Sequence, residues 1–505
     1  MSKQAGRLRA APDFVAFYAR TQPDRLAVGD LASGERWSYR ALHDAIDRCA
    51  AALRDGRGLK AGDRVAVLAK NSGALVILYL ASMRAGLIFV PLNWRLTAAE
   101  LAVLAEDCTP SLLVHDDAHA AVSGALDVTR LSLDALMTAA RQSQPAAMPL
   151  PAADLPSVLL YTSGTSGKPK GVIITGEGIF HSANNFAVMG RVSHESVFLC
   201  ESPLFHVIGL LAALRVPLMY GGTVFMSDGF EPARTIARIA DPDLAVTHYF
   251  CVPQMATSLR NDPSFDPAKL RGLTALYTGG APNPAANIHW WLDHGITMVD
   301  GFGMTETGST FSNSLEPDVI RRKAGSIGLP APTVLMKIVD DDGREVGAGA
   351  TGELWLKGPN VTPGYWNRPE ENAKTFTEDG WFRTGDLVSM DEDGFVSIVG
   401  RKKDMFISGG ENVYPGEVEA ALHEHPAVGE VAVVGVPNER WGETGCAYLV
   451  ARPGAQRANE AELAAFCDAR LARYKIPKRF VWLDALPRTA SGKTQKTVLR
   501  ERRGS

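Results

Sequence analysis

The sequence lacks several features that would place it in a specialised class of proteins. Its 505 residues include only six cysteines, which are widely spread and form no C-x-x-C pair. Neither a zinc site nor a disulfide framework is therefore predicted. The net charge of −4 is far from the concentrated basic excess of a nucleic-acid-binding protein. We therefore expect no nucleic-acid partner. We also expect a cytoplasmic protein, because free cysteines suit a reducing compartment.

Long charge-free hydrophobic runs are also missing. The N-terminal stretch MSKQAGRLRAAPDFVAFYAR has no apolar segment of the kind that a secretory signal peptide contains. The two most apolar windows, 74–92 and 207–222, are interrupted by Arg84 and Arg215, and both contain Gly and Pro. We interpret each window as a buried helix followed by a strand, and we expect no membrane span.

The chain is too long for one hydrophobic core, and domain sizes predict about three or four units. In the stretch WSYRALHDAIDRCAAALRDG, Leu42, Ile46, Cys49 and Leu53 recur at helical spacing, and Ser38 is a plausible N-cap. DRVAVLAKN then has the pattern of a strand, GALVILYLASMRAG that of a helix, and LIFVPL that of another strand. Repeated strand–helix–strand units predict a parallel sheet covered by helices.

The predicted pattern of helices and strands changes farther along the chain. A Pro- and Ala-rich stretch over 141–157 is typical of a linker, and the α/β pattern resumes after it until about residue 335. Alternating strands with Asp-Gly turns then predict antiparallel hairpins. After Arg401 a small α+β unit follows, with a helix over 459–473 that opens on an Asn459/Glu462 capping box.

We therefore expect an α/β protein in two unequal parts. The first is a large N-terminal domain of helix-covered mixed and parallel sheets plus a β-rich subdomain. The second is a small, mobile α+β domain at the C-terminus. The expected boundaries are 1–400 for the first domain, with sub-parts of about 1–150, 151–335 and 336–400, then a junction at 401–403 and the C-terminal domain at 404–505.

The stretch YTSGTSGKPKG, at 161–171, is the first candidate functional motif. Backbone N–H groups, hydroxyls and the two lysines suit a polyphosphate ligand. The Walker pattern fails, because only two residues separate Gly164 from Gly167 and Pro169 follows Lys168. Taken alone, a Gly- and Ser-rich stretch of this kind is more often an ordinary surface loop.

Other candidate motifs are scattered over the rest of the chain. In GFGMTET a carboxylate, Glu306, stands beside Thr305, and a carboxylate there could hold Mg²⁺ together with phosphate oxygens. In WFRTGDL, Asp386 could accept both hydroxyls of a ribose. PRTASGKTQK presents Lys493 on a turn. PLFHVIGL contains His206, which by itself is more often a core residue than a catalyst.

Together and in this order, these stretches resemble the adenylate-forming superfamily of acyl-CoA synthetases, peptide-synthetase adenylation domains and luciferases. The motifs that carry the resemblance are YTSGTSGKPKG, FGMTE, TGD, GRKKD and SGK, and they extend from Tyr161 to Lys493. The resemblance implies that ATP, with Mg²⁺, activates a carboxylic acid as acyl-AMP, and that CoA then receives the acyl group.

The resemblance also implies a role for each matching residue. The β- and γ-phosphates would be held by Thr162, Ser163, Gly164, Thr165, Ser166, Gly167 and Lys170. The acyl and adenine pockets would be lined by Gly279, Gly280, Ala281, Pro282, Phe302 and Gly303, with Phe302 stacked on adenine where the family often has tyrosine. The remaining roles would be Asp386 and Arg401 at the ribose, Thr305 at the α-phosphate, Glu306 on Mg²⁺, His206 beside the acyl carboxylate, Lys493 as the catalytic lysine of adenylation, Lys403 as the hinge, and Gly409 and Gly410 along the CoA tunnel.

The sequence indicates the carboxylic acid and the acceptor of the acyl group less clearly than it indicates the activation by ATP. We expect a medium- or long-chain fatty acid, with an aryl acid as the alternative. The stretch YTGGAPNPAANI has no Arg or Lys to balance the second carboxylate of a dicarboxylic acid. Free CoA is the expected acceptor, because the chain stops soon after the SGK motif, and a separate carrier protein is the alternative. An inactive homologue that binds ligands without catalysis also stays open, as does the choice between monomer and homodimer.

Overall fold

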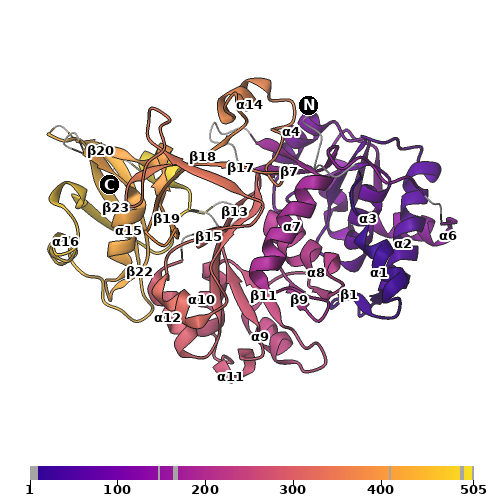
Figure 1. Cartoon of the computed structure of the whole chain (residues 1–505), viewed down its shortest axis with the longest axis horizontal. Coiled ribbons are helices and arrows are strands. Elements are labelled where there is room, and N and C mark those ends of the chain that lie inside the picture. The colour runs from indigo at the N-terminus through magenta and orange to yellow at the C-terminus, as the bar shows by residue number, and fades with distance from the viewer. Residues whose placement is uncertain are drawn as a thin grey trace.

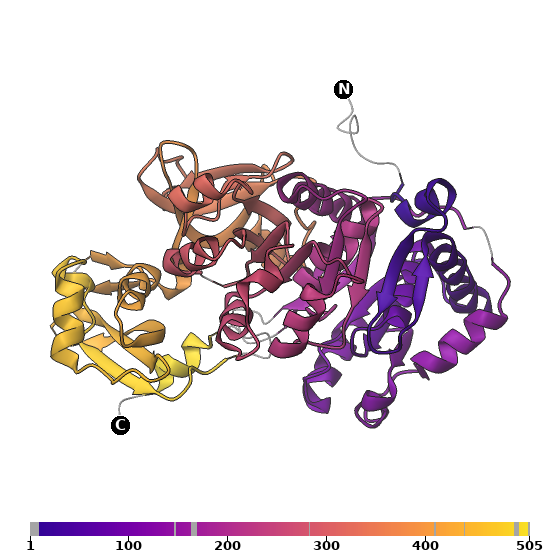
Figure 2. The same ribbon diagram turned by 90° about the horizontal axis from the view of Figure 1, so that it is seen from below.

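Four β-sheets carry the fold of the part of the chain that is described. The computed structural model describes residues 10–145, 148–162, 169–281, 283–408, 411–438, 440–488 and 494–502. Helices cover the two larger sheets, and a smaller sheet lies at one end of the molecule in yellow (Figures 1 and 2). This architecture confirms the expected α/β class with a large N-terminal part and a small C-terminal one.

The six-stranded sheet is parallel except at one edge, where β7 and β8 run antiparallel. Its strands, in spatial order, are β6 (Arg130–Ser132), β5 (Leu112–His115), β3 (Arg64–Leu68), β4 (Ile88–Pro91), β7 (Pro156–Thr162) and β8 (Lys170–Thr175). Alternate residues of β3 enter two different cores: Val65 and Val67 pack on one face, Ala66 and Leu68 on the other. Burial on both faces explains why this strand is apolar throughout instead of alternating.

The nine-stranded sheet is parallel in its centre and antiparallel at both edges. In spatial order it contains β15 (Leu329–Pro330), β14 (Gly308–Ser312), β13 (Met298–Met304), β12 (Ala275–Thr278), β11 (His248–Cys251), β9 (Val197–Cys200), β10 (Thr223–Met226), β1 (Leu26–Asp30) and β2 (Arg36–Ser38). The first strands of the chain thus complete a sheet whose other members follow residue 196. Val28 of β1 is in register with Val224 of β10.

Helices cover both sheets, and α7 contacts β8 of one sheet and β14 of the other. The α-helices are α1 (Phe14–Thr21), α2 (Tyr39–Ala51), α3 (Gly73–Arg84), α4 (Ala98–Cys108), α5 (Ala120–Gly124), α6 (Leu133–Gln142), α7 (Gly176–Gly190), α8 (Val216–Met219), α9 (Pro232–Ala240), α10 (Pro253–Asn261), α11 (Pro267–Leu270), α12 (Ala285–Asp293), α13 (Pro317–Arg322), α14 (Pro369–Thr375), α15 (Pro415–His423), α16 (Glu460–Asp468) and α17 (Lys496–Glu501). Shorter turns are the 3₁₀ segments η2 (Asp117–His119), η4 (Lys402–Asp404) and η5 (Arg473–Lys475), and the π segments η1 (Ala52–Gly56) and η3 (Ile208–Arg215).

Two predicted helix starts are confirmed at the level of the hydrogen bond. The Ser38 hydroxyl accepts from the N–H of Ala41 at the start of α2, and Asn459 and Glu462 form a capping box at the start of α16. The predicted end of α16 is wrong, because the helix stops at Asp468. The carbonyl of Cys467 accepts from the N–H groups of the next turn, and η5 follows as a separate segment.

The predicted hairpins form a four-stranded antiparallel sheet. Its strands are β16 (Leu335–Val339), β17 (Thr351–Lys357), β18 (Phe382–Met390) and β19 (Val396–Arg401). At the turn between β18 and β19, the carboxylate of Asp391 accepts from two backbone N–H groups, and Gly394 has a φ of 85°. This is the left-handed conformation that glycine favours in such turns.

The C-terminal sheet has two cores of its own, one on each face. It consists of β21 (Glu411–Val413), β20 (Phe406–Ser408), β23 (Gly442–Ala451) and β22 (Val428–Asn438), with β24 (Arg479–Leu483) parallel to β23. Its link to the rest of the chain runs through β19 and η4, and α15 packs against β19. The TGD and GRKKD motifs therefore lie close to the junction between the large part and the small one.

Arg84, which interrupts the most apolar window, is buried inside the N-terminal part. Its side chain is 6% exposed, and its guanidinium lies 2.7 Å from a carboxylate oxygen of Asp13 and 2.7 Å from one of Asp47. The window is thus α3 followed by β4, as predicted, with its charge neutralised by two partners. Across the described ranges, no helix combines the length and the apolarity needed to cross a bilayer.

Replacing Arg84 tests how much its buried ion pairs contribute to the free energy of unfolding. Arg84→Ala should lower the free energy of unfolding by about 3 kcal/mol, because two partly buried carboxylates lose their common cation. Arg344→Ala is the matched control: Arg344 pairs with Asp342 on the surface, and its loss should cost about 0.5 kcal/mol or less. Chemical denaturation measures both values. Equal unfolding midpoints for the two variants would contradict a structural role for Arg84.

Candidate active site

The turn between β13 and β14 carries Thr305 and Glu306. Glycine is required on both sides of this turn: a Cβ on Gly303 would overlap the carbonyl oxygen of Gly308, and one on Gly308 would overlap the side chain of Ser182 in α7. Gly308 also has a φ of 59°. The hairpin therefore lies tight against α7, and this close approach fixes the position of the two candidate site residues.

Glu306 is held from two directions. The Tyr365 hydroxyl donates to Glu306 Oε1 at 2.9 Å, and the backbone N–H of Thr362 donates to the Glu306 carbonyl at 2.7 Å. Burial, followed by the charge of Glu306, raises the pKa of Tyr365 well above its ordinary value. The phenol therefore stays protonated and serves as a donor, which aims the carboxylate. Sequence reasoning did not single out Tyr365.

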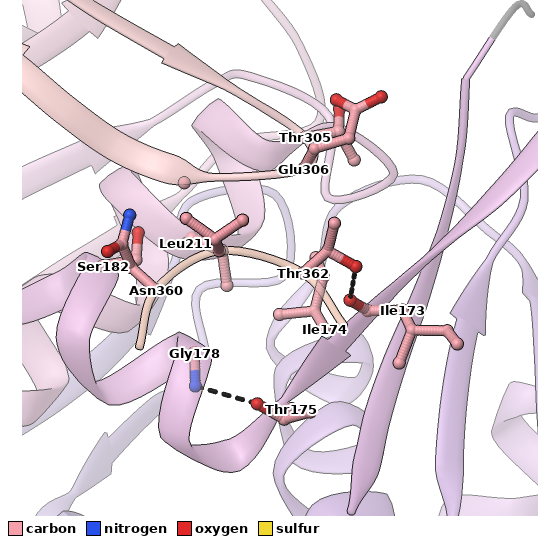
Figure 3. A pocket seen from close by; sticks show the side chains of 12 residues that line it. Ile173, Ile174, Thr175, Gly178, Ser182, Leu211, Thr305, Glu306, Asn360 and Thr362 are labelled. Carbon is pink, nitrogen blue, oxygen red and sulfur yellow. Dashed lines mark hydrogen bonds between the residues drawn. The ribbon is translucent and has the colours of Figure 1, made fainter. Parts of the chain in front are cut away.

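A narrow pocket lies directly behind this turn (Figure 3). Four parts of the chain meet there: β8, α7, η3 and the segment 360–362, which contribute Thr175, Ser182, Leu211 and Thr362 respectively, with Thr305 and Glu306 along one side. The Thr362 hydroxyl donates to the carbonyl of Ile173 at 2.6 Å. In Figure 3 the Glu306 carboxylate points away from Thr175 and Gly178.

The two ends of the predicted phosphate loop lie side by side, because Thr162 of β7 is in register with Lys170 of β8. The Lys170 ammonium pairs with the carboxylate of Glu371 and lies 5.2 Å from the centre of the Tyr365 ring. A cation is thus held beside Glu306 through Tyr365. The loop residues Ser163, Gly164, Thr165, Ser166 and Gly167 lie outside the described residues. Their phosphate contacts stay predictions, as does that of Lys170.

Asp386 and Arg401, predicted to bind a ribose, are direct neighbours. They face each other across β18 and β19, and Arg401 Nε lies 2.7 Å from Asp386 Oδ1. Asp386 is only 2% exposed, whereas the Arg401 side chain is 40% exposed. The positive charge of Arg401 acts on Tyr365 and opposes the rise of its pKa. The pair therefore belongs to the same electrostatic neighbourhood as Glu306 and Lys170.

The predicted acyl-side residues come from two other elements. His206 is half-buried just before η3, with its ring 4.5 Å from that of Phe205. Two residues on, Ile208 Cδ1 would lie 3.4 Å from a Cβ added to Gly280, which has a φ of 80°. The His206 segment and the diglycine after β12 are thus in contact through Ile208. Ala281, the next residue after Gly280, is exposed.

Phe302 and the C-terminal candidates complete the predicted set. Phe302 is half-buried and meets Phe311 edge to face at 5.9 Å. Lys403 lies exposed in η4, next to an ion pair of 2.8 Å between Asp404 and Arg500. The predicted residues Pro282, Gly409, Gly410 and Lys493 lie outside the described residues. Their roles therefore stay predictions.

Sequence reasoning missed three groups close to the site. Tyr365 and Glu371 come from the stretch GYWNRPEE, whose only signal is an aromatic turn before a helix that begins with proline. Asp300 ends the apolar part of β13, directly before the GFGMTE motif. Asp300 accepts from Thr278 Oγ1 and, at 3.1 Å, from Asn283 Nδ2, and burial raises the pKa of Asp300 to about 7. The feature of the sequence that could have indicated Asp300 is its position as a carboxylate at the end of an apolar strand.

The residues present fit a magnesium nucleotide better than a metal held by protein alone. Across the described ranges, no group of three or more His, Cys, Asp or Glu side chains could hold a metal ion. Mg²⁺ bound to a nucleotide needs only one or two protein carboxylates, since phosphates and water supply the other ligands. The resemblance assigns this role to Glu306 and gives Lys170 a place at the phosphates, where a cation is favoured. Both roles stay predictions.

The fold and the comparisons with known proteins together define a nucleotide-using enzyme. The chain belongs to the AMP-binding enzyme family: the family model matches residues 15–366, and the model of the AMP-binding enzyme C-terminal domain matches residues 417–493. The predicted resemblance to the adenylate-forming superfamily, and the expectation of an enzyme, are confirmed.

Similar proteins extend over nearly the whole chain. A feruloyl-CoA synthase from Amycolatopsis sp is 38% identical over 96% of this chain and 97% of its own. The long-chain-fatty-acid–CoA ligase FadD13 of Mycobacterium tuberculosis is 34% identical, with 96% of each chain covered. ATP-bound MatB from Rhodopseudomonas palustris has a TM-score of 0.88 at 34% identity, covering 96% of this chain and 98% of its own. MenE from Bacillus subtilis, solved with ATP and a magnesium ion, has a TM-score of 0.86 at 32% identity, covering 97% and 99%.

Removing the Tyr365 hydroxyl tests its part in aiming Glu306. Tyr365→Phe should lower the rate of acid-dependent pyrophosphate release by about 10-fold and raise the Mg²⁺ concentration needed for half-maximal rate, because a hydrogen bond to a charged group is lost. Tyr220→Phe is the matched control, since its hydroxyl donates to Asn184 at 2.6 Å. If the Mg²⁺ dependence of Tyr365→Phe equals that of the control, Tyr365 does not position the carboxylate.

Proposed function

We propose that this enzyme activates a carboxylic acid with ATP as acyl-AMP and then transfers the acyl group to the thiol of CoA. The observation that carries the proposal is the contact of Glu306 and Lys170 with Tyr365, together with the Asp386–Arg401 ion pair, whose positive charge acts on the same phenol. These groups come from four separate motifs of the adenylate-forming superfamily. Several relatives of the chain are named CoA ligases, which supports CoA as the acceptor.

In the first half-reaction, an oxygen of the acid attacks the α-phosphorus of ATP, and pyrophosphate leaves. Two anions must approach, and negative charge gathers on the phosphoryl oxygens, so pre-aimed cations and donors supply most of the catalysis. The Lys493 ammonium would bridge the acid and the α-phosphate, and Thr305 would donate to a phosphoryl oxygen. Mg²⁺ held by Glu306 would add charge stabilisation. Asp386 and Arg401 would fix the nucleoside through its ribose.

In the second half-reaction, the CoA thiol attacks the acyl carbon and AMP leaves. The same active site must then admit a thiol where a lysine stood. We propose that residues 404–505 form a separate domain that turns about the junction at 401–403, with Lys403 as the pivot, relative to residues 1–400. The turn would withdraw Lys493 and bring Gly409 and Gly410 beside the CoA chain, where glycine lets a slender ligand pass close to the backbone.

The acid itself has two candidate classes. The sequence-based expectation of a medium- or long-chain fatty acid has a counterpart in FadD13, and the aryl alternative has one in the feruloyl-CoA synthase. Both classes offer one carboxylate and an apolar body, which suits the apolar contacts of Ile208 and Gly280. They differ in the length of apolar surface that the acyl group needs.

A coupled assay of pyrophosphate release across a panel of acids, with and without CoA, tests the proposed function. We expect acid-dependent release that needs ATP and Mg²⁺, and an acyl-CoA product when CoA is present. Acyl-AMP that is transferred only to a carrier protein would contradict the CoA assignment. Absence of pyrophosphate release and of acyl-AMP with every acid would contradict the proposed function as a whole.

Lys493→Ala tests the division of labour between the half-reactions. Acyl-AMP formation should fall by roughly 10²–10³-fold, because one pre-aimed charge is lost from the site. Thioester formation from supplied acyl-AMP should stay within about threefold of the wild-type rate, because the proposed withdrawal of Lys493 removes it from that step. Stopped-flow measurement of each step separates them. Equal losses in both steps would contradict the assignment.

A further inference from the structure

The search for the acid's binding surface starts at the diglycine that ends β12. A Cβ on Gly279 would lie 3.4 Å from Phe250 Cζ, and one on Gly280 would lie 3.4 Å from Ile208 Cδ1. Both glycines thus leave the neighbouring side chains uncovered. Under the proposed function the acyl group lies beside His206 and this diglycine, so Phe250 and Ile208 are the first side chains that it meets beyond its carboxylate.

Phe250 belongs to a compact group of three rings that we call the aromatic wall: Phe186 of α7, Phe250 of β11 and Tyr277 of β12. Phe186 and Phe250 stack at 5.9 Å with 22° between their planes, and Phe186 lies 4.8 Å from Tyr277. Phe250 and Tyr277 are partners in register on the same face of the parallel sheet, with ring centres 6.0 Å apart.

The rear of the aromatic wall is locked in place. The Tyr277 hydroxyl donates to the carbonyl of Gly190, the last residue of α7, at 3.0 Å, and His248 Nε2 lies 3.2 Å from the same oxygen. A Cβ on Gly190 would come within 2.6 Å of the Tyr277 hydroxyl, so the helix end and the ring are in direct contact. Moving Tyr277 would therefore break a buried hydrogen bond and leave Gly190 facing a void.

Phe250 is the least buried of the three rings of the wall. Phe186 and Tyr277 are buried, and so are Tyr249 and Cys251, the neighbours of Phe250 along β11. Phe250 itself is half-buried, although it lies on an inner strand of the nine-stranded sheet. Its Cζ lies next to Gly279, a residue without a side chain. The wall thus presents one aromatic ring toward the diglycine, with a closed layer behind it.

From this arrangement we infer that the acid is an aryl carboxylic acid whose ring packs against Phe250, and that the aromatic wall excludes long alkyl chains. The inference rests on the proposed function. A flat ring gains an offset or edge-to-face contact with Phe250 without moving the wall. A long alkyl chain that extended from the diglycine toward Phe250 would have to displace Phe186 and Tyr277 from a close-packed arrangement. None of the three rings carries a charge at neutral pH, so the wall itself offers no ion-pair partner to a charged group on the acid.

Phe250→Ala tests the inference, with cinnamate and dodecanoate as the two probe acids. The wild-type enzyme should use cinnamate with a kcat/KM at least about 10-fold above that for dodecanoate. Phe250→Ala should lower kcat/KM for cinnamate by about 10- to 100-fold, mainly through KM, and should leave that for dodecanoate unchanged or raised. The inverted preference is the readout, because a merely destabilised enzyme would lose activity toward both acids.

Two further variants keep the test decisive. Phe17→Ala removes an exposed ring on α1, far along the chain from the wall, and should change neither kcat/KM. Phe250→Leu retains most of the packing volume; if Phe250→Ala does not fold, Phe250→Leu should show the same inversion in reduced measure. A wild-type preference for dodecanoate, or equal changes for both acids in the folded Phe250 variant, overturns the inference while leaving the CoA ligase proposal intact. No pyrophosphate release with any acid would instead refute the proposed function.

Discussion

The candidate site depends on the segment 365–371, which ties together parts of the chain that carry opposite charges. Tyr365 donates to Glu306, and Glu371 pairs with Lys170. The same segment is bonded to the edge of the six-stranded sheet, because the N–H of Trp366 donates to the carbonyl of Gly171. A carboxylate and an ammonium group are thus held near each other without contact between them. A polyphosphate with its magnesium ion needs both charges, each in a separate place.

This arrangement supports the prediction that several unremarkable motifs serve one site. A carboxylate in a turn, an Asp after a glycine and a lysine beside a loop each have ordinary structural roles in most proteins. Here the turn after β13 carries Glu306 and β8 carries Lys170, and both contact Tyr365. The Asp386–Arg401 pair of β18 and β19 adds a positive charge that acts on the same phenol. The chemistry comes from the grouping, because positioned charges in a partly buried site act more strongly than the same groups in water.

The fold class and many local features could be predicted from the sequence because they depend on neighbouring residues. The Ser38 cap, the Asn459/Glu462 capping box and the turn at Asp391 involve groups two to four residues apart. The aiming of Glu306 by Tyr365 and the pairing of Lys170 with Glu371 span 59 and 201 residues. Local patterns carry no record of such pairings. Resemblance to a family supplied the site residues but not the side chains that hold them, nor the aromatic wall that faces the diglycine.

The interleaving of the two large sheets has a consequence for how the chain acquires its structure. β1 and β2 leave the ribosome first, yet β1 has its parallel partner in β10, which ends at Met226. The strands of the six-stranded sheet lie between β2 and β10 in the sequence, so that sheet can form before β1 pairs with β10. Pairing of strands so far apart in the sequence is slow, because the entropy of loop closure is lost before the new contacts stabilise the fold. Until then the edge of Leu26–Asp30 that pairs with β10 has no partner strand in the nascent chain.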